Sequence, residues 1–500
     1  MFQNKSRVFL LLLAIFSVSV LIRLPFLNRP VSRHHEDITA HALKPIETWT
    51  AEGALKYAFN HVLTYANPGD KYVQDEPSSI MDKNGNFYYV SRGTLSILLP
   101  FLAFKLFHIS PTILSLQIFN LCLHFLISML VYIVLSALFR KEDSPLNKPA
   151  LLGFVIYVFS PVALWFHGNA YAAESLGQFF FILGLLLFLK WHQGEQNRWR
   201  WACLLGADVF FMICNDWLGL FLASVLLGMS LLQWRDREYR ILSGCVAAAI
   251  LFSVGLVLWQ FSQIDGWAVY AEHAFGRLSQ RTGFHGAGPL RNIPLYYMAA
   301  HLPFLIFLGG MFAFLFWKKE KISLTGLEKR ILVLAILPVL FFDLVFINVT
   351  TYHAFFPLKA TLYIALIAAL LFRGLQAHWR PVFTAVFIGL ILLSVFQFWF
   401  INRSPDLQYK VIGEKIRALA RPDEVVFVRS PSFYPHYQIL LYAKRNIAVW
   451  RGEPAARALL EKTGLERGIV FTLDKNTLLL HPGDISSQTF FQGNSGLPSE

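Results

Sequence analysis

The segment RHHEDITAH, residues 33–41, gathers ionisable side chains in a chain that is otherwise strongly apolar. It holds three histidines, His34, His35 and His41, and two adjacent acids, Glu36 and Asp37. A carboxylate of this kind can act as a general base that takes a proton from a hydroxyl group. Imidazole together with carboxylate can instead bind zinc or manganese.

The spacing does not fit a zinc peptidase. Such a helix would read H-E-x-x-H, and Thr39 stands where the second histidine would be. A looser metal site made of His34, His35 and His41, with Asp37 as a further ligand, stays open, although its spacing is not diagnostic. A divalent metal is therefore one alternative, and no cofactor is certain.

The composition is that of an integral membrane protein. Of the 500 residues, 55% are hydrophobic and 15% are charged, whereas soluble domains are about 45–50% apolar and about 25% charged. The net charge of +13 could suggest nucleic acid. However, Lys and Arg lie mainly in short tracts between apolar runs, as on the cytoplasmic loops of membrane proteins. We expect the lipid bilayer, and no nucleic acid, as a partner.

The apolar runs predict a polytopic α-helical protein with about eleven transmembrane helices, since each crossing needs about 20 apolar residues. The expected spans are 8–25, 112–139, 150–166, 172–190, 201–215, 217–233, 241–262, 295–316, 331–347, 358–372 and 381–400. The basic tracts alternate sides only if 94–109 is a re-entrant or interfacial helix. The N-terminus is then inside and the C-terminus outside. The first span should remain as an anchor, because no small-residue cleavage site follows it.

Two domains are expected. Residues 1–400 form the transmembrane domain, including a long first external loop at 28–93. Residues 401–500 alternate helix and strand patterns, with strands at EVVFV, IAVW and GIVFTLD, and predict a small extracytoplasmic α/β domain. This segment lacks a Gly-rich phosphate loop, so it is not read as a nucleotide site.

Several stretches resemble a known family. The acidic pair after the first span is followed by NFYYVSRGTLSILLPFLAFKLF, then SPVALWFHGNAYAAESLGQFFF and a late YHAFFPLKATL. Together they look like the GT-C membrane glycosyltransferases, and within these the branch of the protein O-mannosyltransferases and lipid A aminoarabinose transferases. The resemblance covers most of the first 400 residues through short, degenerate motifs.

The resemblance implies a GT-C fold and a catalytic base among the acids of the first external loop. Here that base is Glu36 or Asp37, and the register leaves both open. A second acidic position of the family corresponds to Glu174, which could equally be a carboxylate favoured by a helix N-terminus. Asp216, at an external turn, is a weaker candidate, because Asn-Asp is also ordinary turn chemistry.

The sugar donor that the resemblance implies is linked to a polyprenyl phosphate. This phosphate leaves with growing negative charge, which fixed cations nearby would stabilise. Arginine is the better clamp, since it pairs with two phosphate oxygens at once. Alternatively, each external basic residue simply reaches toward lipid headgroups. The candidates are Arg92, Arg277, Arg281, Arg291, His353 and Lys359.

The resemblance thus implies a hexosyl or pentosyl transferase that uses a polyprenyl-phosphate-linked sugar donor and a hydroxyl-bearing acceptor: a lipid, a glycan or a protein. The expected location is the bacterial inner membrane, with the site on the extracytoplasmic face. The rival is a transporter or flippase of lipid-linked sugars, which should carry charges inside several spans. Here mid-span charges are few, mainly Asp208 and Asp343. A non-catalytic scaffold would not need paired external acids. The sequence identifies neither the sugar, nor the acceptor, nor the oligomeric state.

Overall fold

The computed structural model describes residues 2–32, 35–73, 79–139, 146–194, 197–282, 288–320, 322–430, 434–473 and 480–486. These residues form two compact units. One unit, here called the helical unit, contains Met1–Asn28, Leu114–Leu258 and Leu278–Ser404. The other contains Arg29–Ile113, Trp259–Arg277 and Pro405–Glu500, and is called the external unit after the position that the sequence analysis expects for its loops. The first long loop and the C-terminal segment, far apart in sequence, thus belong to the same unit.

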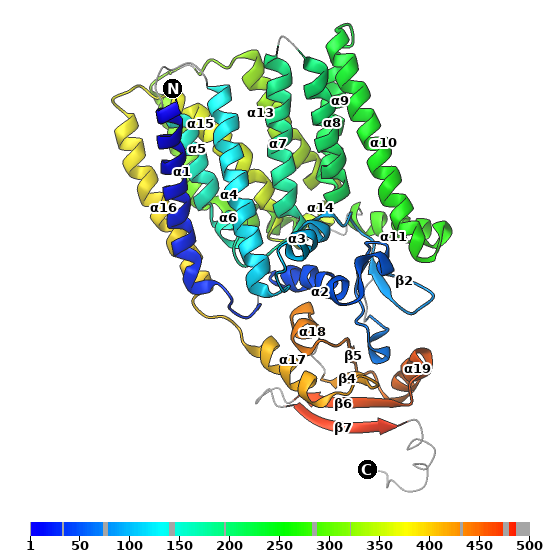
Figure 1. The fold of residues 1–500 in the computed structure, drawn as a ribbon. Helices are drawn as coiled ribbons and strands as arrows, with labels where there is room; N and C mark the ends of the chain where they lie inside the picture. Colours follow the sequence, from blue (N-terminus) through cyan, green and yellow to red (C-terminus); the bar gives the residue numbers. More distant parts are fainter. Residues whose placement is uncertain are drawn as a thin grey trace. The chain divides into compact units, whose positions relative to one another are not determined.

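The helical unit consists mainly of long apolar helices that run alongside one another (Figure 1). In chain order its helices are α1 (Phe2–Arg23), α4 (Ile113–Leu138), α5 (Lys148–Phe159), α6 (Pro161–Phe166), α7 (Ala173–Gln193), α8 (Arg198–Asn215), α9 (Leu218–Leu232), α10 (Arg237–Asp265), α12 (Asn292–Trp317), α13 (Gly326–Val345), α14 (Ile347–Thr350), α15 (Thr361–Gly374) and α16 (Arg380–Asn402). Short 3-10 turns lie at η1 (Leu24–Phe26), η4 (Gly288–Arg291) and η5 (Phe356–Ala360).

Local sequence sets the helix ends and contacts. Pro161 separates α5 from α6, because the residue before a proline avoids the helical conformation, and Ser160 is extended there at ψ 132°. Gly153 lets α5 approach its neighbours, since a Cβ there would meet Leu135 of α4 at 2.2 Å and the Ala365 carbonyl of α15 at 3.3 Å. Close packing of this kind suits helices that cross a bilayer.

Seven helices of the described residues are long and apolar enough to cross a membrane. They are Ser6–Phe26, Ile113–Leu138, Ala173–Gln193, Arg237–Asp265, Asn292–Trp317, Phe356–Gly374 and Arg380–Asn402. The protein is therefore a polytopic, mostly helical membrane protein, as expected. The four further expected spans correspond to α5 with α6, α8, α9 and α13, so the count of eleven and the N-in, C-out orientation stay predictions.

The external unit contains all seven strands of the described residues, together with several shorter helices. Its first-loop elements are α2 (Asp37–Glu52), η2 (Ala54–Tyr57), β1 (His61–Val62), η3 (Pro68–Asp70), β2 (Ser79–Met81), β3 (Phe87–Tyr89) and α3 (Leu95–Leu106). Helix α11 (Trp267–Thr282) follows α10. The C-terminal elements are α17 (Gln408–Leu419), β4 (Val425–Arg429), α18 (Tyr437–Ala443), β5 (Ile447–Val449), α19 (Glu453–Thr463), β6 (Arg467–Leu473) and β7 (Leu480–Ser486).

The ambiguous stretch 94–109 contains α3, a helix of 12 residues. At a rise of about 1.5 Å per residue it spans about 18 Å, less than the roughly 30 Å of a bilayer core. Its length suits the expected re-entrant or interfacial role, which remains a prediction.

The C-terminal sheet has the strand order β5-β4-β6-β7, with β4 parallel to β5 and β6 and with β7 antiparallel to β6. Strands β4, β5 and β6 lie where the sequence predicts them. Strand β4 reads as a continuous apolar run because both of its faces are covered. Val426 and Val428 pack with α17 and α18, while Val425 and Phe427 pack with α19 and with Tyr72 of the first loop.

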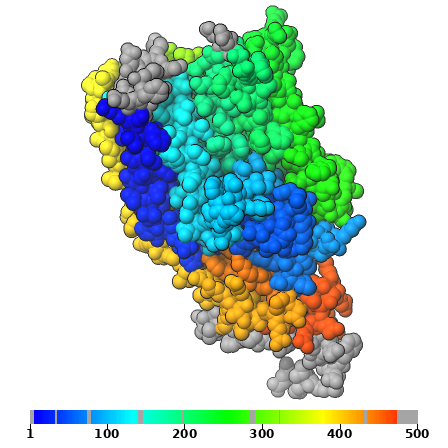
Figure 2. All heavy atoms as spheres, viewed as in Figure 1, coloured from blue at the N-terminus to red at the C-terminus, as the bar shows by residue number. Residues whose placement is uncertain are grey.

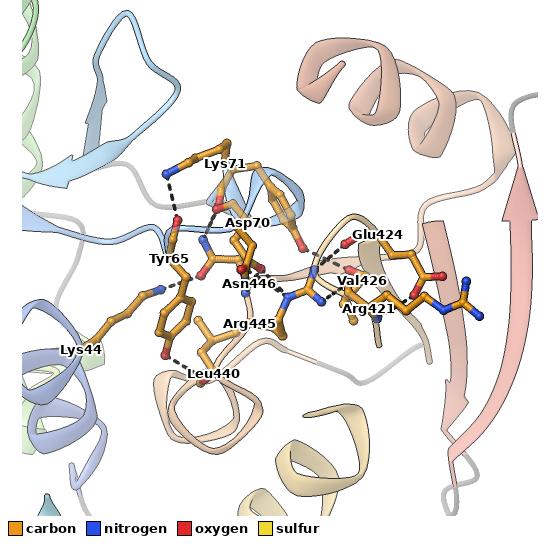
Figure 3. Close-up of polar contacts among 12 residues, drawn as sticks. Lys44, Tyr65, Asp70, Lys71, Arg421, Glu424, Val426, Leu440, Arg445 and Asn446 are labelled. Carbon is orange, nitrogen blue, oxygen red and sulfur yellow. Dashed lines mark hydrogen bonds and ion pairs between the residues drawn. The ribbon is translucent and has the colours of Figure 1, made fainter. Parts of the chain in front are cut away.

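A buried polar network joins the first loop to the C-terminal segment (Figure 3). Arg445 Nε donates to both carboxylate oxygens of Asp70 at 3.0 Å, and the Asn446 backbone N–H donates to Asp70 Oδ1 at 2.8 Å. Lys44 Nζ of α2 donates to Asn446 Oδ1 at 2.6 Å. In Figure 2 the surfaces of the first loop (blue) and the C-terminal segment (orange) adjoin. The two segments therefore fold as one unit and position α2 together.

Candidate functional site

Glu36, one of the two candidate bases, has both carboxylate oxygens bonded to nearby residues of the first loop. It forms an ion pair with Arg29, and its Oε2 accepts hydrogen bonds from the Ser32 backbone N–H at 2.6 Å and the Ser32 hydroxyl at 3.2 Å. Its side chain is only 1% exposed. Burial raises the pKa of Glu36, and the charge of Arg29 opposes that rise. Glu36 thus fixes the turn that leads into α2.

Asp37, the other candidate, begins α2 and is half-buried. Burial raises the pKa of Asp37, while positive charge at His35 and at His436 of the C-terminal segment lowers it, and the net direction is upward. A carboxylate whose pKa is raised is a stronger base than a fully solvated one. Asp37 therefore has the surroundings of a proton acceptor, with two imidazoles as its charged neighbours.

His41 follows Asp37 by four residues, so the two side chains share one face of α2. The His41 ring lies in an aromatic cluster, 4.2 Å from His61, 4.5 Å from Tyr437 and 5.0 Å from Tyr89 between ring centroids. His61 Nε2 donates to the His41 carbonyl oxygen at 3.1 Å, since a carbonyl oxygen can only accept. The residues of this cluster come from α2, β1 and β3 of the first loop and from α18 of the C-terminal segment.

Arg92 supplies positive charge to this cluster. Burial and the charge of Arg92 together lower the pKa of His61 to about 3. Burial, with smaller effects from His61 and Arg92, holds the pKa of His41 well below its usual value. Both imidazoles are therefore neutral near pH 7, so the positive charge that acts on the cluster comes from Arg92 and Lys44. Arg92, one of the expected phosphate ligands, is therefore close enough to His41 and His61 for its charge to act on them.

The expected metal site is not assembled from described residues. Among the residues that the structure describes, no group of three His, Cys, Asp or Glu side chains is placed to hold a metal ion. His34 lies outside the described residues, and the ring of His41 packs among His61 and two tyrosines. A metal bound by His34, His35 and His41 stays a prediction.

Glu174 and Asp216 lie in the helical unit. Glu174 is buried in the first turn of α7, and Asn215, at the end of α8, donates through Nδ2 to the Ala173 carbonyl at 2.9 Å. A Cβ added at Gly177 would lie 4.0 Å from Asp216 Oδ2. The start of α7 and the end of α8 therefore bring both acids into one polar region.

Lys359 and His353 occupy aromatic surroundings in the helical unit. Lys359 is fully buried, with Nζ 3.2 Å from the Phe342 ring centroid and 3.9 Å from that of Phe356. His353 stacks on Phe355 at 4.9 Å. The hydroxyl of Tyr297 donates to Asp343 Oδ2 at 2.5 Å, so this mid-span acid has a partner.

The remaining candidate cations lie on or near α11. Arg277 and Arg281 are four residues apart on α11 and therefore share a face of that helix, and both are half-buried. Arg291 is exposed in η4. A phosphate role for these three residues remains a prediction.

The sequence analysis did not identify Arg23, a buried cation of the helical unit. Arg23, at the end of α1, is fully buried and contacts His124 Nδ1 of α4 through Nη2 at 3.0 Å. His124 in turn stacks on His167 at 4.5 Å. Arg23 reads in sequence as the polar flank of an apolar run, and no local pattern connects it to His124, 101 residues later.

Comparisons with known proteins agree on the fold. No protein-family model matches the chain, and no curated protein matches it in sequence. The chain is similar in structure to ArnT from Cupriavidus metallidurans in the apo state, with a TM-score of 0.63 and 10% identity. It is also similar to the same protein bound to undecaprenyl phosphate, with a TM-score of 0.59 and 11% identity. Each comparison covers 93% of both chains. It is also similar to the oligosaccharyltransferase AglB from Archaeoglobus fulgidus in complex with an inhibitory peptide and a dolichol-phosphate, at TM-score 0.53 and 12% identity, over 92% of this chain and 69% of that one. These proteins are GT-C membrane glycosyltransferases.

Proposed function

From the GT-C fold of this chain, we propose that the protein is a glycosyltransferase that moves a sugar from a polyprenyl-phosphate carrier to a hydroxyl-bearing acceptor. Two structures with this fold hold polyprenyl phosphates: ArnT binds undecaprenyl phosphate and AglB binds a dolichol-phosphate. A lipid-linked donor also suits a chain whose described residues include seven helices able to cross a bilayer.

The surroundings of Asp37 carry the proposal. Burial raises the pKa of both acids. Glu36, however, has both oxygens engaged by Arg29 and Ser32, whereas Asp37 is half-buried beside His35 and His436. We assign Asp37 as the general base and Glu36 as a residue that positions it. The choice between the two acids, open in the sequence, rests on this difference.

The reaction has one bond made and one broken. Asp37 takes the proton of the acceptor hydroxyl as its oxygen attacks the anomeric carbon of the donor sugar. The bond between that carbon and the phosphate oxygen breaks, and the polyprenyl phosphate leaves with the electron pair. Asp37 then releases its proton to solvent.

Arg92 is the proposed counterion of the leaving phosphate. A guanidinium that is already in place can stabilise charge that grows in the transition state without reorganising. The neighbouring His41 and His61, neutral near pH 7, can hydrogen-bond phosphate or sugar oxygens. The acid Glu174 and the basic residues Arg277, Arg281, Arg291, His353 and Lys359 stay predicted contributors to catalysis and phosphate binding.

We place the reaction on the extracytoplasmic face of a bacterial inner membrane, with a hexosyl or pentosyl group as the transferred sugar. The orientation follows from the basic tracts between apolar runs, which favour a cytoplasmic N-terminus and an external first loop. A lipid, a glycan or a protein hydroxyl can serve as the acceptor.

A donor panel tests this function. Purified protein in lipid nanodiscs is given labelled sugars on synthetic polyprenyl phosphates together with mixed hydroxyl acceptors, with and without a chelator. Transfer from at least one donor supports the transferase. If no donor supports transfer but the reconstituted protein moves lipid-linked sugar across liposomes, the flippase replaces it. Chelator-sensitive transfer restored by zinc or manganese supports a metal at His34, His35 and His41.

A further inference from the structure

The external unit contains a cavity of about 540 Å³. Three segments surround it: the end of η2 and the residues after it (55–60), the turn between β2 and β3 with part of β3 (82–88), and the junction of α10 with α11 (263–266). Its volume falls within the roughly 300–1,000 Å³ typical of small-molecule sites.

The cavity walls are held by hydrogen bonds. Gln260 Nε2 donates to the Phe59 carbonyl at 2.8 Å and to Thr94 Oγ1 at 3.1 Å. Asp82 accepts from the Tyr88 hydroxyl at 2.8 Å and from the backbone N–H groups of Asn84 and Asn86, each at 2.8 Å. These hydrogen bonds hold the cavity walls in place, and Asp82 orders one of the walls.

Buried polar side chains line the interior. Asn60 is 1% exposed and donates through Nδ2 to the Gln260 carbonyl at 3.1 Å, while its Oδ1 accepts no hydrogen bond from any residue described. Tyr57 and Tyr88 are also buried, with ring centroids 6.3 Å apart. Buried polar atoms are normally paired, so Asn60 Oδ1 is a position for a donor such as a ligand hydroxyl.

The charges around the cavity balance. Its lining includes two lysines, Lys56 and Lys83, and two aspartates, Asp82 and Asp265. Lys56 forms an ion pair with Glu52, and Asp82 is occupied by the turn. This arrangement favours neither a phosphate nor a cation. Aromatic rings beside amide and carboxylate groups instead match a sugar, which offers apolar C–H faces and many hydroxyls.

We propose that this cavity binds a neutral sugar residue of the acceptor, so that the acceptor is an oligosaccharide or carries one. This inference rests on the proposed glycosyl transfer. The cavity adjoins the C-terminal end of α2, whereas Asp37 begins that helix. Since α2 has 16 residues, the two ends lie roughly 22 Å apart. The bound sugar is therefore separate from the sugar being transferred, and several acceptor residues span the distance.

Direct binding, without donor, tests the inference. Full-length protein in nanodiscs is titrated with neutral oligosaccharides of increasing length and, separately, with inorganic phosphate. The variant Asn84→Ala/Asp265→Ala alters two exposed residues of the lining. The matched control Asp423→Ala/Glu461→Ala alters two exposed residues elsewhere in the same unit.

We expect an oligosaccharide to bind, the lining variant to weaken binding about tenfold, and the control to bind like wild type. In transfer assays the lining variant should raise KM for a long acceptor more than KM for a single-sugar acceptor, whereas the control variant should change neither KM. Equal binding by the lining variant and the control, binding of phosphate in place of sugar, or no binding of any neutral oligosaccharide would overturn the inference. If the protein binds oligosaccharide without donor and the lining variant weakens this binding, the sugar-binding cavity is supported. If the same protein transfers no sugar from any donor, the proposed transferase function is rejected while the cavity stands.

Discussion

Glu36 and Asp37 are adjacent in the chain and have opposite surroundings. Glu36 is 1% exposed and is held by Arg29 and Ser32, whereas Asp37 is half-buried beside His35 and His436. One acid closes the turn that enters α2, and the other faces groups that titrate. Mutations at the two positions should therefore have different effects.

The variant Glu36→Gln should lose stability. It leaves the buried charge of Arg29, 9% exposed, without its carboxylate, and breaking a buried pair costs about 3–5 kcal/mol. Thermal unfolding in detergent measures the loss, with Asp37→Asn as the control that should unfold close to wild type. Equal stability of Glu36→Gln and wild type would show that Glu36 does not hold the turn.

The pair Asp70 and Arg445 should be essential to the external unit. Arg445 is buried between Asp70 and the Glu424 carbonyl, so Asp70→Asn leaves a buried guanidinium poorly compensated, again at a cost of about 3–5 kcal/mol. We expect faster proteolysis of the segment after residue 404 in Asp70→Asn than in Glu453→Gln, which breaks an exposed pair with Arg457. Identical digestion patterns would contradict the role of the network.

Lys44 should make stability depend on pH. Burial lowers its pKa from 10.5 to about 7, against the attraction of Asp70 and Glu47. Between pH 7 and 10.5 the unfolded state binds more protons at Lys44 than the folded state, so its contribution raises the free energy of unfolding as pH rises, by about 1 kcal/mol per pH unit. Unfolding measured from pH 7 to 10 should show a flatter slope in Lys44→Met than in the exposed control Lys410→Met. Parallel slopes would mean that Lys44 is not protonated on unfolding.

Arg92 should govern the use of donor. Removing a charged hydrogen-bond partner of phosphate costs about 1.5–3 kcal/mol, so Arg92→Gln should lower kcat/KM for the donor by about 10-fold to 100-fold, and Arg92→Lys should recover part of the loss. Steady-state transfer kinetics check this, with Arg277→Gln as a comparison from α11. A larger effect at Arg277 would move the phosphate site to that helix.

The sequence predicted elements that rest on one continuous pattern. The long apolar helices and the strands β4, β5 and β6 follow from hydrophobic runs whose length or continuity is diagnostic. Strand β7 was missed because it contains Pro482 and Gly483, residues that argue against a strand. It pairs with β6 alone, and such an edge position tolerates proline.

The site was predicted only in part, because its residues are brought together by folding. The acidic pair stands out in one short segment, but its division of roles depends on Arg29, seven residues before Glu36, and on His436, about four hundred residues after Asp37. His61, Tyr89 and Tyr437 join His41 from three other elements. No pattern within a single segment encodes these contacts.

Single-turnover transfer by Asp37→Asn, with the labelled donor already bound, tests the central claim most directly. The account predicts that Asp37→Asn binds donor like wild type and transfers the sugar about 10²- to 10⁴-fold more slowly, while folded Glu36→Gln retains a rate within about tenfold of wild type. Transfer by Asp37→Asn at the wild-type rate, with Glu36→Gln folded but inactive, would contradict the assignment of Asp37 as the base.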